Sequence, residues 1–283
     1  MSKVARRVAV VTGAASGIGR AVALRLAARG CDLAICCDSN LEGLGETAEG
    51  IDRLGRRATT HQVDVADRDA VRVFAGEVIR DHGRVQILVN NAGVGLVAPI
   101  ETMEPSDLEW LLRINFWGQI YCTQAFLPHL LEHESHIANV SSVWGICAAP
   151  AQSAYSISKF AIRGFTEALC QELAKTPISV SLVLPGGIRT DIARKARYRA
   201  GAGSLSDPVT AARLFDRVAM TSPERAARII VRGIERRKRR ILVGPDAYLL
   251  DGLQRLLPSG YRYILPLVHS WLESRGDPAL DHR

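Results

Sequence analysis

Two hydrophobic patterns alternate along the first two-thirds of the chain. Short runs such as VAVVT and DLAICC are apolar at nearly every position, and longer segments with apolar residues at helical spacing lie between them. Strands that are apolar on both faces are typical of a parallel sheet covered by helices on both sides. The pattern therefore predicts an α/β fold, a doubly wound parallel sheet of Rossmann type with about seven strands and helices on both faces.

The expected elements follow one another along the chain in near-regular alternation. We expect strands at 7–12, 32–37, 58–63, 85–90, 136–141, 178–184 and 241–244. We expect helices near 17–29, 40–54, 67–82, 106–131 and 153–175, and a further one opened by Ser222-Pro223-Glu224. Ligands of such sheets bind beyond the carboxyl ends of the strands, so functional residues are expected in the loops that follow them.

The alternation weakens after residue 190. We expect one domain over 1–283, in which 1–190 form a cofactor-binding and catalytic core, 191–222 a substrate loop, and 223–283 the last helix, last strand and C-terminal tail. The tail contains the apolar stretch YRYILPLVHSWL at 261–272, which is too short to cross a bilayer. Its expected role is to cover a site or a subunit interface.

Composition narrows the class of protein. A hydrophobic fraction of 47% and a charged fraction of 23% describe an ordinary globular protein. No apolar run approaches the roughly 20 residues of a membrane span, and MSKVARR at the start lacks the apolar segment of a secretory signal. The six cysteines include no CxxC pair and no grouping with histidine, so no metal site is predicted. Neighbouring Cys36 and Cys37, in an apolar run, favour a reducing, cytoplasmic location.

The net charge of +7 is concentrated in one segment. Residues 189–240 contain 15 Lys or Arg against 5 Asp or Glu. Such a segment can bind nucleic acid, an anionic membrane surface or an anionic substrate, or it can be a solvated face. Its densest part, RRKRR at 236–240, lies where a helix should end and where cations complement the helix dipole. The solvated face is the favoured interpretation; nucleic acid is not an expected partner, and peripheral membrane contact stays open.

A glycine-rich turn follows the first expected strand. TGAASGIG at 12–19 leads directly into the first expected helix, where glycines let a pyrophosphate approach the positive helix N-terminus. Asp38 follows the second expected strand, where a carboxylate accepts hydrogen bonds from the adenosine ribose and repels a 2′-phosphate. Ser16 stands where a cation would favour that phosphate. The sequence therefore favours NAD over NADP.

Tyr155 and Lys159, in AYSISKF, are spaced to share one helix face. A nearby ammonium can lower the pKa of a tyrosine from about 10 by roughly 1–3 units, toward the range in which it works as a base. The pair alone is also compatible with an ordinary helix surface.

Taken together, the motifs resemble the classical short-chain dehydrogenase/reductase family. They are TGxxxGxG at 12–19, NNAG at 90–93, Asn115, SS at 141–142, YSISK at 155–159 and PGGIRT at 185–190, in family order. The resemblance implies that Tyr155 is the general acid/base, Ser142 binds the substrate oxygen, Lys159 binds the nicotinamide ribose and acts on Tyr155, and Asn115 holds a water of a proton relay.

The resemblance also implies a set of cofactor contacts, together with Tyr155 and Lys159. They are Gly13, Ser16, Gly17, Ile18, Gly19, Asp38, Asp64, Val65, Asn90, Ala92, Gly93, Pro185, Gly186, Ile188 and Thr190. In the family, the helices corresponding to 106–131 and 153–175 form subunit interfaces, which implies a homo-oligomer, a dimer or tetramer.

The substrate is less closely defined. Ser142, Val143, Trp144 and Gln152 are the expected pocket residues, together with the loop 191–222. An enclosed apolar pocket favours a hydrophobic secondary alcohol or ketone of steroid, retinoid or long-chain type. Arginines at the start of the loop suit an anionic substrate, which leaves a 3-oxoacyl or 3-hydroxyacyl thioester as an alternative. A non-catalytic NAD-sensing protein is the alternative from a different functional class.

Overall fold

The computed structural model describes residues 7–263. Seven parallel strands form one sheet in the order β3-β2-β1-β4-β6-β7-β9. Their bounds are β1 Val8–Thr12, β2 Asp32–Cys37, β3 Ala58–Gln62, β4 Ile87–Asn90, β6 Ser135–Val140, β7 Ile178–Pro185 and β9 Arg240–Val243. The strand order reverses between β1 and β4, which is the switch point where ligands of this architecture bind. The predicted fold class is confirmed.

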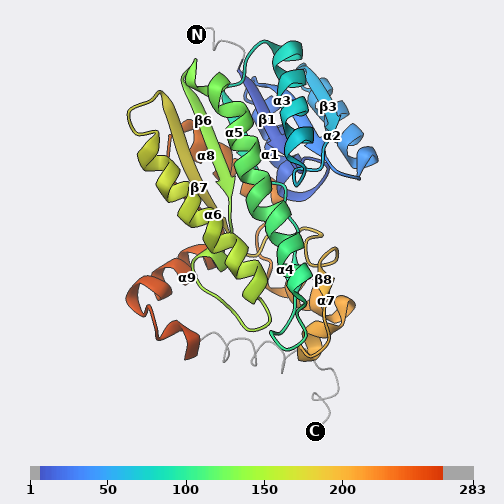
Figure 1. The fold of residues 1–283 in the computed structure, drawn as a ribbon, viewed down its shortest axis with the longest axis vertical. Helices are drawn as coiled ribbons and strands as arrows, with labels where there is room; N and C mark the ends of the chain where they lie inside the picture. Colours follow the sequence, from blue (N-terminus) through green and yellow to red (C-terminus); the bar gives the residue numbers. More distant parts are fainter. Residues whose placement is uncertain (1–6, 264–283) are drawn as a thin grey trace.

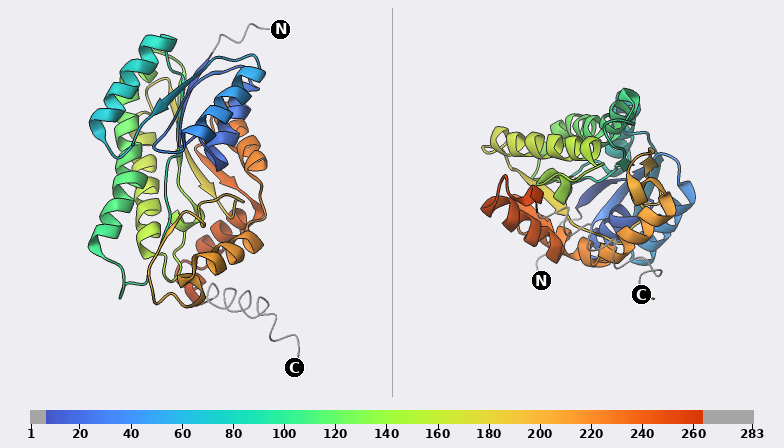
Figure 2. Two further views of the ribbon diagram at one scale, coloured as in Figure 1. Left: turned by 90° about the vertical axis from the view of Figure 1, so that its right-hand side faces the viewer. Right: turned by 90° about the horizontal axis from the view of Figure 1, so that it is seen from below.

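Helices cover both faces of the sheet (Figures 1 and 2). One layer contains α1 Gly17–Ala27, α2 Leu41–Arg53 and α8 Pro223–Glu235, and the other contains α3 Arg68–His82, α5 Gly118–Leu131 and α6 Ser153–Glu172. Alternate residues of β1 enter opposite cores, because Ala9 and Val11 pack with the first layer while Val8 and Val10 pack with the second. The continuous apolar strands of the sequence reflect this two-sided burial.

Smaller elements lie beyond the carboxyl ends of the strands, at the lower end of Figure 1. They are α4 Pro105–Leu112, α7 Pro208–Val218, α9 Pro245–Leu256 and the short strand pair β5 Leu96–Val97 with β8 Arg197–Tyr198. These elements surround the sheet edge where the site residues were expected. Among the described residues, no helix is long and apolar enough to cross a membrane.

Three elements differ from the sequence prediction. The single helix expected over 106–131 is divided by a π-helical turn, Arg113–Trp117, between α4 and α5. Helix α7 lies inside the segment 191–222 that was expected to be a loop, and its start is marked by Asp207, which accepts the N–H of Thr210, and by Pro208. Helix α9 opens the predicted tail, and the remainder, from 264 onward, lies outside the described residues.

Candidate active site

The glycine-rich turn lies between the end of β1 and the start of α1. Thr12 Oγ1 accepts hydrogen bonds from the backbone N–H groups of Asn91 and Ala92, both 3.0 Å long. These bonds hold the turn against the end of β4. Gly13 has φ +66°, and a Cβ there would lie 2.9 Å from Ala92 Cα. A Cβ on Gly19 would collide with the carbonyl oxygen of Gly13. The turn therefore has a backbone that only glycine permits.

The first turn of α1 is open to a ligand. Ser16 occupies the N-cap position, but within the described chain its side chain makes no capping hydrogen bond, and the first N–H groups of a helix have no partner inside it. Ser16, Gly17 and Ile18 are all partly exposed. A Cβ on Gly17 would lie 3.1 Å from Thr190 Cγ2, so the segment after β7 lies against this turn. This arrangement fits a diphosphate group.

The two acidic residues proposed for the adenosine end follow neighbouring strands. Asp38 comes directly after β2 and is exposed, and Gln62 Nε2 donates to its backbone oxygen at 2.9 Å. Asp64 is also exposed, and its carboxylate accepts the N–H of Ala66 at 2.9 Å. Val65 is buried, and a Cβ on Gly118 would lie 2.7 Å from its Cγ2.

Asn90 contributes to the core rather than presenting its side chain to the cleft. It is fully buried, and its amide donates to Asn139 Oδ1 at 2.9 Å and to Thr123 Oγ1 at 3.0 Å. These bonds join the ends of β4 and β6 to α5. Gly93 lies nearer the expected catalytic residues, because a Cβ there would lie 3.1 Å from Asn115 Oδ1 and 3.7 Å from Lys159 Nζ.

Ser142, Tyr155 and Lys159 converge at the end of β6. Ser142 is the N-cap of a short 3₁₀ helix, Val143–Gly145, and accepts the N–H of Trp144 at 3.2 Å. Helix α6 begins at Ser153, so Tyr155 and Lys159 occupy its first two turns. Lys159 Nζ lies 5.5 Å from the centre of the Tyr155 ring and donates to the carbonyl of Val140 at 3.3 Å. The sequence spacing does place this pair on one helix face.

The surroundings change the proton affinity of both groups. Burial raises the pKa of Tyr155 to about 12, and a hydrogen bond with Ser142 acts in the opposite direction. Burial lowers the pKa of Lys159 to about 8. Tyr155 is therefore a protonated phenol at neutral pH, beside an ammonium that is still largely charged. An additional positive charge near the ring would lower the pKa of this phenol.

Asn115 lies inside the π-helical turn, a feature that is frequent at functional sites. Its Oδ1 accepts the N–H of Val94 at 2.8 Å, and its Nδ2 donates to Val94 O at 3.0 Å and to Ser158 Oγ at 3.2 Å. Ser158 Oγ in turn donates to the carbonyl of Tyr155 at 2.7 Å. The Asn115 side chain thus links the segment after β4 to the helix that holds Tyr155.

The PGGIRT segment begins at the last residue of β7, Pro185, and forms hydrogen bonds with β9 and α9. Gly186 N donates to Val243 O at 2.9 Å, and Gly187 N donates to Asp246 Oδ2 at 2.5 Å. A Cβ on Gly186 would overlap the same carboxylate. Pro185 and Ile188, on either side of these two glycines in the sequence, are buried. Asp246 was not predicted as a site residue, although the Gly-Pro-Asp sequence at 244–246 does indicate a helix start.

The residues proposed for the substrate lie in the short 3₁₀ helix after β6 and just before α6. Val143 is buried, while Trp144 and Gln152 are partly exposed. Gln152 precedes α6 and follows Ala151, which has φ +57°, a strained value for a residue other than glycine. The carbonyl of Ala151 accepts the N–H of Ala98 at 2.9 Å, which holds the strained residue in place.

Two arginines of the loop 191–222 attach it to α4. Arg199 forms a bidentate ion pair with Asp107, both bonds 2.7 Å long, and Asp107 is only 1% exposed. Hydrogen bonding from Arg199 holds the pKa of Asp107 below its ordinary value. The guanidinium of Arg197 lies 3.6 Å from the ring centre of Trp110. Both cations are therefore used in packing the loop.

A third arginine of the loop is also paired. Arg194 forms ion pairs with Asp216 of α7 and with Asp191, the latter at 3.3 Å. In the part of the chain that the structure describes, Arg189 and Lys195 make no ion pair.

The segment after α9 contacts the chain near Ser142, since the Tyr261 hydroxyl accepts a long hydrogen bond of 3.4 Å from Ala148 N.

The doubly wound parallel sheet and the glycine-rich turn at the end of β1 are those of a nucleotide-binding protein of Rossmann type, and comparison with known proteins gives the family. The short chain dehydrogenase family matches residues 7–200. An oxidoreductase of Mycobacterium tuberculosis described as putative, SadH, is 42% identical over 269 residues, covering 94% of this chain and 96% of its own. The 3-oxoacyl-[acyl-carrier-protein] reductase FabG of Thermotoga maritima is 34% identical over 201 residues, 71% of this chain and 81% of its own.

A solved structure agrees with this assignment. A short-chain dehydrogenase/reductase of Burkholderia phymatum in complex with NAD superposes with a TM-score of 0.80 at 28% identity, covering 91% of this chain and 95% of that one. The chain belongs to the short-chain dehydrogenase/reductase family, as its motifs predicted, and it is an oxidoreductase of the kind that uses NAD or NADP.

Proposed function

We propose that this protein transfers a hydride between NAD and a hydrophobic secondary alcohol or its ketone. The observation that carries the proposal is the convergence of Ser142, Tyr155 and Lys159 at the carboxyl edge of the sheet. The glycine-rich turn, which fits a dinucleotide, lies at the same edge. Bound there, the nicotinamide supplies or accepts the hydride.

Tyr155 is the proposed general acid and base. In the ketone-reducing direction its hydroxyl donates a proton to the substrate oxygen, and in the alcohol-oxidising direction the phenolate accepts it. Ser142, which shares a hydrogen bond with Tyr155, holds the same substrate oxygen. Because burial raises the tyrosine pKa to about 12, the protein must lower it again for oxidation. The ammonium of Lys159 and the positive nicotinamide ring both act in that direction.

Asn115 is proposed to keep the catalytic helix in register with the cofactor cleft. It bonds both the backbone of Val94 and the hydroxyl of Ser158, one turn from Tyr155. The water-holding role that the family resemblance implies would add to this function. Its side-chain amide is already engaged by protein groups.

NAD is the proposed cofactor because of Asp38. This carboxylate is exposed immediately beyond β2 and, among the described residues, accepts no side-chain hydrogen bond. It is therefore available to the adenosine ribose hydroxyls and would repel a 2′-phosphate. Ser16, at the N-terminus of α1, offers no positive charge that would offset this repulsion.

A hydrophobic substrate of steroid, retinoid or long-chain type is proposed from the state of the loop arginines. Arg194, Arg197 and Arg199 are engaged with acidic or aromatic partners of the same chain, so they are not free to attract a carboxylate or phosphate. Val143 and Trp144 give the wall beside Ser142 an apolar character. This use of the arginines favours the uncharged substrate.

A 3-oxoacyl or 3-hydroxyacyl thioester is the second candidate substrate. The similarity to a 3-oxoacyl-[acyl-carrier-protein] reductase over 71% of this chain favours it. Exposed Arg189 and Lys195 remain available for an anionic carrier. The two substrate classes share the same chemistry at Tyr155, so only substrate trials separate them.

The deciding experiment follows the absorbance of the reduced nicotinamide. Purified protein would be incubated with NAD or NADP and with steroid, retinoid, long-chain and 3-hydroxyacyl-thioester alcohols. We expect turnover with NAD on a hydrophobic alcohol. Turnover on the thioesters alone would select the second candidate. Tight NAD binding without turnover on any class would contradict the enzymatic proposal and favour an NAD-sensing protein.

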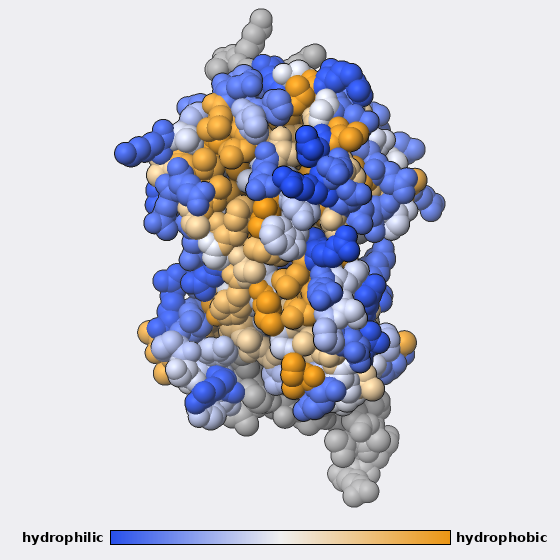
Figure 3. All heavy atoms as spheres, viewed as in Figure 1, coloured by the Kyte–Doolittle hydropathy of each residue, from blue (hydrophilic) through white to orange (hydrophobic). Residues whose placement is uncertain are grey.

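A homo-oligomer is proposed from the face formed by α5 and α6. Trp117, next to α5, is 44% exposed, and Ile157 and Phe160 on α6 are 46% and 40% exposed. Figure 3 shows a continuous apolar band over these helices. Burying it in a dimer or tetramer would remove a large apolar patch from water. Light scattering coupled to gel filtration tests this, and a monomer at micromolar concentration would contradict it.

A further inference from the structure

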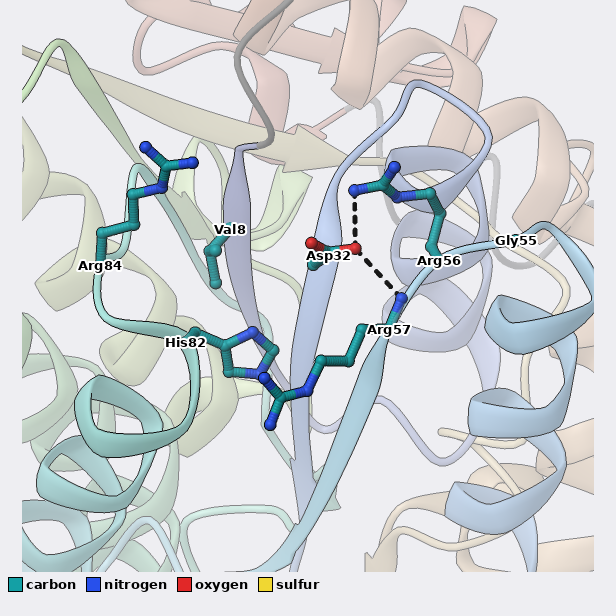
Figure 4. A pocket seen from close by; sticks show the side chains of 7 residues that line it. All are labelled: Val8, Asp32, Gly55, Arg56, Arg57, His82 and Arg84. Carbon is teal, nitrogen blue, oxygen red and sulfur yellow. Dashed lines mark hydrogen bonds and ion pairs between the residues drawn. The ribbon is translucent and has the colours of Figure 1, made fainter.

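A polar cavity lies at the opposite edge of the sheet from the candidate active site. It has a volume of about 440 Å³ and opens at the amino-terminal ends of β1, β2 and β3, beside the connection from α3 to β4 (Figure 4). It is lined by Val8, Asp32, Gly55, Arg56, Arg57, His82 and Arg84. The lining therefore contains three guanidinium groups and one carboxylate. The proposed hydride-transfer chemistry uses none of these residues.

The single carboxylate of the cavity is already engaged. Asp32 Oδ1 lies 2.6 Å from a terminal nitrogen of Arg56 and accepts the backbone N–H of Arg57 at 3.0 Å. Figure 4 shows both interactions, with Asp32 between the two arginines. Asp32 thus compensates one of the three cations. A net positive charge of two remains on the lining.

The other two guanidinium groups have no carboxylate of their own. Arg57 Nη1 donates to the backbone carbonyl of Asp81 at 2.6 Å, which orients the group without neutralising it. Arg84 makes no hydrogen bond or ion pair with any residue between 7 and 263. Figure 4 shows Arg84 and Arg56 on opposite sides of the first strands, with Arg57 and His82 between and below them.

The ends of the neighbouring helices do not account for these arginines. A cation stabilises a helix when it lies within the last turn. In α2 that position is taken by Arg53, and in α3 by Arg80. Arg56 and Arg57 come after the C-cap Leu54, and Arg84 comes after the C-cap Gly83. The cavity arginines are therefore additional to the cations that the helix ends require.

His82 connects the cavity to a chain of polar groups across β3. Its Nε2 lies 3.0 Å from Thr59 Oγ1, Thr59 Oγ1 lies 3.0 Å from His61 Nε2, and His61 Nδ1 lies 3.0 Å from Glu77 Oε2. Burial, then the nearby Arg57, lowers the pKa of His82, and His61 acts in the same direction while Asp32 and Asp81 oppose it. An anion in the cavity would raise this pKa.

We propose that this cavity is a binding site for a small, multiply charged anion bearing phosphate groups. The guanidinium fork matches phosphate oxygens in a bidentate manner, so Arg57 and Arg84, both in the lining, can each bind one anionic group. Carboxylates share this chemistry, so the test includes a polycarboxylate. The site is independent of the proposed dinucleotide site, which lies at the carboxyl edge of the same strands.

The test measures binding of pyrophosphate, and separately of citrate, by calorimetry with and without saturating NADH. NADH would occupy the glycine-rich turn and remove binding there. The variant Arg57→Gln/Arg84→Gln keeps the Asp32–Arg56 pair. The control Arg72→Gln/Arg232→Gln removes the same charge from exposed positions of α3 and α8. We expect pyrophosphate binding in the presence of NADH that weakens about tenfold or more for each lost cavity arginine and is retained in the control.

Three results would overturn the proposal. They are absence of pyrophosphate binding at millimolar concentration, binding that NADH removes completely, or equal weakening in the cavity variant and the control. Tighter binding of citrate than of pyrophosphate would refute the phosphate assignment. Titration of the His82 ring by NMR gives a second readout, because its pKa should rise on binding in the wild type and not in the cavity variant.

Discussion

Asp246 provides a sharp test of how the cofactor cleft is held together. Its carboxylate accepts the N–H of Gly187 at 2.5 Å and fills the space beside Gly186. The segment from Pro185 to Thr190 contains four of the cofactor contacts expected from the family resemblance, Pro185, Gly186, Ile188 and Thr190. Asp246→Ala would leave this N–H without its acceptor and open a gap behind the segment. We therefore expect NADH to bind more weakly, although Asp246 is not proposed to touch it.

The size of the effect follows from the hydrogen bond. A hydrogen bond to a charged group contributes about 1.5–3 kcal/mol. Asp246 is only partly buried, so water screens part of this contribution, and the lower limit of about 1.5 kcal/mol applies. That value corresponds to about tenfold weaker binding. Asp246→Asn keeps an acceptor oxygen of similar shape, and the loss should be only about two- to threefold.

The assay is a fluorescence titration of NADH, with thermal unfolding measured in parallel. Asp52→Ala, an exposed acidic residue near the end of α2, serves as a control that changes the same charge. NADH affinity should fall in the order wild type, Asp246→Asn, Asp246→Ala. Equal affinity for Asp246→Ala and the control would refute the positioning role. A lower unfolding midpoint without weaker binding would show that Asp246 serves only stability.

Three further predictions follow from the site and the core. Tyr155→Phe should lower turnover by about 10²–10⁴-fold while NADH still binds, and unchanged turnover in the absorbance assay would exclude Tyr155 as the acid/base. Asp38→Ala should shift the preference from NAD toward NADP, measured as the ratio of kcat/KM values, and an unchanged ratio would show that other residues read the adenosine end. His136 is a buried residue of β6 whose Nε2 lies 2.7 Å from Ser181 Oγ of β7. Burial lowers the pKa of His136 to about 4, against about 6.5 when unfolded, so the unfolded chain takes up a proton first as the pH falls. Stability should therefore decrease from pH 6.5 to 4, by about 3 kcal/mol from this group, and denaturant unfolding of His136→Gln should show a smaller decrease; an identical pH profile would contradict this.

The sequence predicted the sheet and its turn well because both depend on local residue patterns. Most of the strands are apolar on both faces, and the structure confirms all seven expected strands with only small differences at their ends. The edge strand β3 is the exception in burial, because its residues ATTHQ are only partly buried or exposed. The glycines at 13, 17 and 19 were likewise recognisable, because the tight turn that they allow depends on the absence of a side chain at these three positions. Spacing alone also placed Tyr155 and Lys159 on one helix face.

The remaining features depend on contacts between distant segments. Asp246 reaches Gly187 only because β9 lies next to β7, an arrangement that no local pattern encodes. The π-helical turn at Asn115 adds one residue to a helix whose apolar spacing continues on both sides. The sequence left the loop arginines as a possible anion site. Their partners, Asp107 and Trp110, could not be recognised because they lie far away in the sequence.

The attachment of the loop to α4 has a consequence for protein engineering. Arg199 and Arg197, together with the β5–β8 strand pair, join the proposed substrate loop to residues 96–110. A chimera that exchanges 191–222 alone for the loop of a relative would leave the buried carboxylate of Asp107 without its cation. The two segments therefore have to be transplanted together, and libraries intended to alter substrate range should vary them as one module.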